Sequence, residues 1–154
     1  MCAIIGGIKE LIDMMAVNST DARKNWSSVS ESVIREKPAF IKKTRDYMLL
    51  SNMEFMNEIL SGYTFSAAEY TEDDGSVTLS LNELDLVENG KDEGEARGRL
   101  ARSILEYATD FYREFSVRSA APNKKREIPY VFKALVLDDY EKIGACITCR
   151  PGKN

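Results

Sequence analysis

The sequence predicts an α+β protein: a small strand-helix-hairpin-helix domain, then a module built from a β-hairpin and a long helix. Short alternating apolar stretches, typical of strands, lie beside segments whose apolar residues recur every three or four positions, as in helices. A break in this pattern at Ser61-Gly62 coincides with an acidic block, since residues 61–95 carry one basic and ten acidic side chains. We therefore expect an N-terminal extension at residues 1–13, a first domain at 14–61 and a second module at 62–154.

The first expected helix covers residues 18–37. It opens with three side chains that favour a helix N-cap, Asn18-Ser19-Thr20. Its apolar residues share one face because they are spaced four, three and four positions apart: Ala22, Trp26, Val29 and Val33. Pro38 ends the helix, because proline disfavours helical geometry in the residue before it.

A β-hairpin and a second helix complete the first domain. Residues 39–41 and 47–50 are expected to be strands joined by the polar turn 42–46, and residues 14–17 can add a short strand. Asn52 can cap a helix whose apolar side carries Phe55, Met56, Ile59 and Leu60. A domain of fewer than fifty residues buries little core by itself, so we expect dimerisation to cover its remaining apolar surface.

Two stretches of this domain resemble the N-terminal domain of Phd/YefM-type antitoxins. They are TDARKNWSSV at residues 20–29 and EKPAFIKKTRDYMLLS at residues 36–51. In the same order, that family has a Ser/Thr-x-Ala-Arg stretch on the first helix, an apolar strand ending in a basic pair, a short turn, a strand ending in serine, and a helix. The resemblance covers about a third of the chain.

The resemblance implies a dimer that binds a pseudo-palindromic operator upstream of its own gene pair. The arginine of the Ala-Arg step corresponds to Arg23, and the basic residue entering the hairpin corresponds to Lys43, where the family more often has arginine. Neighbouring DNA contacts are expected from Ser19 or Thr20, Lys24, Lys42 and Arg45. The alternative is that the turn cations only solubilise the hairpin. We expect Trp26 to pack in the core rather than to stack on a base.

The second module begins with a predicted β-hairpin. Residues 63–70 and 77–81 are expected to be its strands, joined by the turn 71–76, and a third strand can lie near residues 84–87. A long helix follows, with Asp92 as its N-cap and Glu95 in a capping-box position. One continuous apolar stripe predicts the buried face of this helix: Ala96, Leu100, Ile104, Ala108, Phe111 and Phe115. Pro122 interrupts the chain, and a second apolar helix is expected from Pro129.

The run ENGKDEGEARGRLARSILEYA, residues 88–108, is similar to the start of the helix in HicB-like antitoxin domains, and also fits longer Phd-like antitoxins of RelE/RelB-type systems. HicB-like domains use this part to mask a toxin, so the resemblance implies that residues 62–154 bind one. RelE-type toxins are usually basic, which suits the acidic block. The alternative is that these acids only form turns and helix caps: Glu69, Glu72, Asp73, Asp74, Asp92, Glu93 and Glu95.

The composition argues against an enzyme. The chain has no histidine, which removes Ser-His-Asp and Cys-His catalysis and the commonest zinc ligand. No glycine-rich phosphate-binding motif is present. Cys146 and Cys149 have CxxC spacing, but they form only half of a zinc site and lack a thioredoxin-like context. We therefore predict no catalytic activity, no cofactor and no metal.

The chain is also expected to be cytoplasmic, with no membrane partner. No stretch approaches the ~20 apolar residues of a membrane helix. Residues 1–15 lack the basic start and small-residue cleavage site of a signal peptide.

The sequence and the resemblance together predict an antitoxin of a type II toxin–antitoxin system. It would neutralise a cognate, RelE-type toxin by direct binding and repress its own operon as a homodimer or higher even oligomer. Two alternatives stay open: a ligand-responsive transcriptional regulator, and an interaction adaptor that does not bind DNA.

Overall fold

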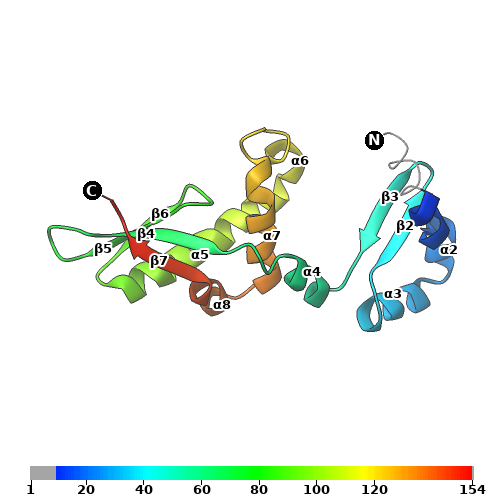
Figure 1. The fold of residues 1–154 in the computed structure, drawn as a ribbon, viewed down its shortest axis with the longest axis horizontal. Coiled ribbons are helices and arrows are strands. Elements are labelled where there is room, and N and C mark those ends of the chain that lie inside the picture. Colours follow the sequence, from blue (N-terminus) through cyan, green and yellow to red (C-terminus); the bar gives the residue numbers. More distant parts are fainter. Residues whose placement is uncertain (1–9, 154) are drawn as a thin grey trace. The chain divides into compact units, whose positions relative to one another are not determined.

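The structure, a computed structural model, describes residues 10–153 and has the predicted mixed α+β composition (Figure 1). The chain divides into two compact units, Met1–Met56 and Asn57–Asn154. Most of the expected N-terminal extension lies outside the described residues, but residues 10–15 are helical.

The first unit is a three-stranded sheet with helices. Strand β2 lies in the middle, parallel to β1 and antiparallel to β3. Helix α4 crosses the division between the two units. The elements are β1 (Val17–Asn18), α2 (Ser19–Lys24), α3 (Trp26–Arg35), β2 (Ala39–Lys43), β3 (Asp46–Leu50) and α4 (Met53–Ile59).

The single helix expected at residues 18–37 is two helices, because the chain leaves helical geometry at Asn25. Its φ and ψ are −115° and 34°, and its side-chain amide donates to the Asp21 carbonyl at 3.1 Å. Such local side-chain bonds compete with a regular helix. The expectation that Trp26 packs in the core is wrong, since its side chain is 52% exposed, whereas Ala22 and Val33 are buried.

The core of the first unit is small. Among residues 10–56, three apolar side chains are buried: Ala22, Val33 and Ile41. Asn52 caps α4 as expected, because its side-chain oxygen accepts the Phe55 N–H at 2.7 Å. Its amide also donates to the Ile34 carbonyl at 3.0 Å, which joins the start of α4 to α3.

The second unit is a four-stranded sheet in the order β6-β5-β4-β7, packed against helices (Figure 1). Strands β4, β5 and β6 are antiparallel neighbours, and β7 is parallel to β4. The elements are β4 (Phe65–Thr71), β5 (Val77–Leu81), β6 (Val87–Gly90), α5 (Glu93–Arg113), α6 (Phe115–Arg118), a 3-10 turn (Lys125–Glu127), α7 (Ile128–Leu137), α8 (Tyr140–Ala145) and β7 (Ile147–Pro151).

Helix α5 forms the centre of this unit's core. Its predicted apolar stripe is buried along most of its length, and α7 and α8 pack against it. The sheet contributes alternate residues from each strand, because successive side chains point to opposite faces. The fully or almost fully buried set includes Phe65, Ala67, Leu79, Ala96, Leu100, Ile104, Phe111, Val131 and Ile143.

The N-terminus of α5 has the predicted cap with one shift. The Asp92 carboxylate accepts the Glu95 N–H at 2.8 Å, while Glu95 reaches back to the N–H of Lys91 rather than of Asp92. Gly90 lies directly against this turn, since a Cβ there would be 2.3 Å from the Ala96 nitrogen. Only glycine permits β6 to approach α5 so closely.

The expected third strand at residues 84–87 is displaced. Strand β6 starts at Val87, and the preceding loop instead places Leu84 in the core, where it is 1% exposed. The apolar residue Leu84 is buried in the core from a loop, so its burial does not require it to belong to a strand. Helix α8 and strand β7 have no counterpart among the expected elements.

Truncating the α5 stripe will destabilise the second unit. Leu100→Ala removes a fully buried side chain and should lower the free energy of unfolding by about 2–5 kcal/mol. Urea denaturation followed by circular dichroism measures the loss. Val117→Ala, at a side chain that is 74% exposed, is the control and should change stability by less than about 0.5 kcal/mol. Equal effects would contradict the placement of the core.

The cap also predicts a pH dependence. The hydrogen bond from the Lys91 N–H holds the pKa of Glu95 below its ordinary value. A depressed folded-state pKa stabilises the fold above the unfolded-state pKa, and this contribution is lost as pH falls through the folded-state pKa. The melting temperature of Glu95→Gln should therefore lie below that of the wild type at about pH 6 and approach it near about pH 3.

Glu106→Gln is the matched control for this measurement. Glu106 is exposed on α5, and its side chain makes no hydrogen bond or ion pair with the described residues. This variant measures the effect of losing one exposed carboxylate of α5 across the same pH range. A pH dependence of Glu95→Gln no greater than that of Glu106→Gln would contradict the role of the cap.

Candidate functional site

The seven residues expected to contact DNA all lie in the first unit. Four are on α2, two at the end of β2 and one in the turn before β3: Ser19, Thr20, Arg23, Lys24, Lys42, Lys43 and Arg45. Ser19 and Lys42 are half-buried and the other five are exposed. Asn18 caps α2 by accepting the Thr20 N–H at 2.9 Å, so the polar start of this helix has a local structural role.

Four of the five candidate cations have no internal partner. The side chains of Arg23, Lys24, Lys43 and Arg45 make neither a hydrogen bond nor an ion pair with any residue between 10 and 153. Their charges are exposed to solvent and available to an anionic ligand. The sequence predicts the residue types here, and the structure adds that no carboxylate of the described chain neutralises them.

Lys42 differs from the other cations. Its ammonium lies 2.6 Å from the Asp13 carboxylate and 5.5 Å from the centre of the Tyr47 ring. The Tyr47 hydroxyl donates a hydrogen bond to the same carboxylate. Hydrogen bonding to Asp13 is the largest cause that raises the pKa of Lys42, and it also raises the pKa of Tyr47. We call this group the Asp13–Lys42–Tyr47 cluster.

The strand separates Lys42 from Lys43. Neighbouring side chains on a strand point to opposite faces, so Lys43 shares a face with Ile41. Ile41 lines a shallow pocket of about 240 Å³ together with Ser19, Ala22, Arg23, Trp26 and Met48. Arg23 and Lys43 therefore belong to the α2 side of the sheet, whereas Lys42 points to the other side. Sequence reasoning treated them as one group.

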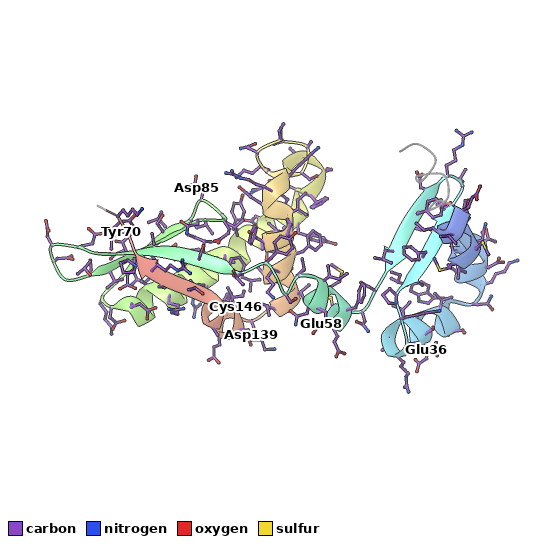
Figure 2. The ribbon with its side chains drawn as sticks, viewed as in Figure 1. Glu36, Glu58, Tyr70, Asp85, Asp139 and Cys146 are labelled. Atoms are coloured by element: carbon purple, nitrogen blue, oxygen red, sulfur yellow. The ribbon has the colours of Figure 1, made fainter. Side chains whose placement is uncertain are left out.

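Most acids of the acidic block, residues 61–95, form contacts within the second unit. Six of its ten acids accept hydrogen bonds or form ion pairs within the described chain: Asp74, Glu83, Glu88, Asp92, Glu93 and Glu95. The turn and cap interpretation is therefore correct for Asp74, Asp92 and Glu95, whereas Glu93 forms an ion pair with Arg97. The carboxylates of Glu69, Glu72, Asp73 and Asp85 make no hydrogen bond or ion pair in the described part of the chain. Asp85 lies on the loop between β5 and β6 (Figure 2).

One small cluster has the residue types of a metal site. Ligand atoms of Glu69, Glu93 and Cys149 lie within 4.8 Å of one another. However, Arg97 reaches the same place, with its Nε 2.7 Å from Glu93 and Nη2 3.2 Å from the Cys149 sulfur. A guanidinium already balances the carboxylate, so the arrangement fits a structural ion pair.

The two described cysteines are free thiols on neighbouring elements. Cys146 is the C-cap residue of α8 (Figure 2). Cys149 lies in β7. Burial is the largest cause that raises the pKa of the Cys149 thiol. A raised pKa leaves less of the nucleophilic thiolate at neutral pH, which argues against a reactive cysteine there.

Comparison with known proteins identifies the family. No curated protein matches this chain at a significant level. A crystal structure from Syntrophomonas wolfei subsp. wolfei, described as an antitoxin part of a candidate toxin/antitoxin system, is similar, with a TM-score of 0.84. The two chains are 30% identical, and the match covers 88% of this chain and 98% of that one.

No helix within residues 10–153 is long and apolar enough to cross a membrane.

The family model of antitoxins from RelE/RelB toxin–antitoxin systems matches residues 14–149, which include most of both units. Because this match spans most of the chain, the protein belongs to the PHD-like antitoxins of RelE/RelB toxin–antitoxin systems.

Proposed function

We propose that this antitoxin represses its own operon by binding operator DNA through the first unit, and neutralises its toxin by direct contact with the second. The observation that carries the first half is the set of four unpartnered cations: Arg23, Lys24, Lys43 and Arg45. The protein would act by binding, without catalysis or a cofactor, in the cytoplasm.

The position of the unpaired cations supports a DNA-binding role for the first unit. Arg23 and Lys24 lie on α2 and Lys43 and Arg45 lie at the hairpin, and none of these side chains forms an ion pair with the described residues. Ion pairing alone does not distinguish the units, because five cations of the second unit are paired, from Arg97 to Lys124, and others such as Lys125 and Arg126 are not. Each cation that binds a phosphate releases a counterion, which makes the affinity dependent on salt.

A homodimer or higher even oligomer would complete the DNA-binding unit. Its core contains few buried apolar residues, while large apolar side chains stay exposed on both faces of β3. Met48 is 47% exposed on one face and Leu49 is 49% exposed on the other. On its outer side, β3 has no strand partner among the described residues. Two copies related by a two-fold axis would present two basic surfaces to a pseudo-palindromic operator.

The turn between β4 and β5 is the best candidate for an electrostatic contact with the toxin. It carries Glu72, Asp73 and Asp74 in a row, all exposed. Of these three side chains, only that of Asp74 has a partner in the described chain, the Ser76 N–H at 2.9 Å. By the family resemblance the toxin is basic, so this turn would attract it and orient its approach. The body of the unit would then cover the toxin sterically.

Reversing the charge of Arg23 should weaken operator binding. Arg23→Glu removes one phosphate contact and adds repulsion, so the affinity at 0.1 M salt should fall about tenfold or more. Its side chain is exposed and unpartnered, so the melting temperature should change little. The measurement is a titration of the fragment upstream of the gene, with a scrambled fragment as competitor.

Lys37→Glu is the matched control, since Lys37 is an exposed cation of the same unit outside the candidate set. It should weaken binding less than Arg23→Glu. If Arg23→Glu binds the fragment as the wild type does, the DNA-binding assignment is wrong. If the wild type prefers neither fragment, the adaptor interpretation becomes the better one.

Reversing the acidic turn should weaken toxin binding. The double variant Glu72→Lys/Asp73→Lys should bind the purified product of the adjacent gene about tenfold more weakly, mainly through slower association. The effect should shrink as salt increases, because exposed charges are screened. Calorimetry measures the affinity, and stopped-flow mixing measures the association rate. The double variant Glu106→Lys/Glu141→Lys, at exposed acids of α5 and α8, is the charge-matched control, and an equal loss in both double variants would refute a specific role for the turn.

A further inference from the structure

Asp13 stands just outside the part of the chain that the family model matches, which begins at residue 14. It belongs to the short helical stretch at residues 10–15. Nevertheless, its carboxylate contacts two residues of the matched hairpin, Lys42 in β2 and Tyr47 in β3. An acidic side chain that precedes the family segment thus takes up one of the five cations expected to bind DNA.

The geometry holds the Lys42 ammonium from two sides. It lies 2.6 Å from Asp13 and 5.5 Å from the centre of the Tyr47 ring, its cross-strand neighbour. Tyr47 also donates its hydroxyl hydrogen to Asp13, so the carboxylate is fixed by both strands. A phosphate that bound Lys42 would have to replace the Asp13 carboxylate as its anionic partner.

The exchange is physically accessible because the ion pair is exposed. The side chains of Lys42 and Asp13 retain 35% and 41% of their accessible surface. Exposed pairs contribute little to stability and are weakened by salt. Moreover, Lys42 lies at the end of the hairpin that carries Lys43 and Arg45.

We propose that Asp13 is an intramolecular competitor of DNA phosphate at Lys42, which sets operator affinity below its maximum. The proposal rests on operator binding by the first unit. It assigns residues 10–15 a regulatory role: while Asp13 contacts Lys42, the hairpin offers one cation fewer, and DNA bound at Lys42 displaces the carboxylate. A change that moves this stretch away from the hairpin would strengthen binding.

The test is a double-mutant cycle in the full-length protein. Wild type, Asp13→Asn, Lys42→Gln and the double variant are titrated with the upstream fragment at several salt concentrations. Asp13→Asn keeps an acceptor for the Tyr47 hydroxyl and removes only the charge. It should bind about two- to eightfold more tightly at 0.1 M salt, with a steeper salt dependence by up to about 0.9.

Lys42→Gln decides whether the gain acts through Lys42. In the wild-type background it should cost little, because Lys42 is already paired. In the Asp13→Asn background it should abolish the gain. Glu31→Gln is the matched control, since it removes one negative charge from an exposed pair with Arg35 in the same unit.

Three outcomes would overturn the proposal. Affinity of Asp13→Asn equal to wild type, with an unchanged melting temperature, would place Lys42 outside the DNA surface. A gain that survives Lys42→Gln, or that Glu31→Gln reproduces, would mean a general charge effect. If the wild type and all variants bind the fragment no better than scrambled DNA, the proposed operator binding is wrong, and the proposed competition at Lys42 is wrong as a consequence.

Discussion

The second unit depends on the contact between α5 and one face of its sheet. The helix brings an unbroken apolar stripe, and small side chains on it allow close approach: Ala96, Ala101 and Ala108 are fully buried. Gly90 lets β6 meet the first turn of the helix, where any side chain would collide with the Ala96 backbone. The fixed position of α5 also orders α7 and α8, which pack against it, and through α8 the parallel strand β7. The acids near the start of α5 have roles at the same place, because Asp92 accepts the Glu95 N–H of the first turn and Glu95 accepts the Lys91 N–H just before the helix.

The first unit, in contrast to the second, has little buried core. Three small or medium apolar residues form its described core, and larger ones such as Trp26 and Met48 lie on the surface. A domain with so little buried area gains stability from a partner. Its surface therefore carries the groups available for binding: unpartnered cations on α2 and the hairpin, and exposed apolar side chains suited to a protein contact. The proposed DNA binding and the proposed dimerisation would both use elements of this small unit.

Local patterns predicted the local elements well, and longer-range pairing was missed. The α5 stripe, the Asp92 cap and the Asn52 cap depend on residues within a turn or two of each other, and all three are present. Strand β7 was not predicted, because it is defined by parallel pairing with β4, such as Phe65 with Ile147, and no local pattern encodes that partner. Trp26 was misplaced because Asn25 interrupts the helix that would have turned it inward. The Asp13–Lys42 contact joins residues 29 positions apart, so periodicity could not indicate it.

The number of charged residues in a segment does not show which charges a binding partner can reach. The sequence has a strongly acidic block and a nearly neutral first domain, but many of these charged side chains are already paired within the fold. Six of the ten acids in the block are engaged in caps, side-chain hydrogen bonds and ion pairs, and its exposed acids without a side-chain partner in the described chain are Glu72, Asp73 and Asp85. In the nearly neutral domain, four of the five candidate cations have no side-chain partner among the described residues, while Asp13 pairs with the fifth, Lys42. Since a binding partner responds to unpaired, exposed charge, the electrostatic roles of the two units follow from which charges the fold leaves uncompensated.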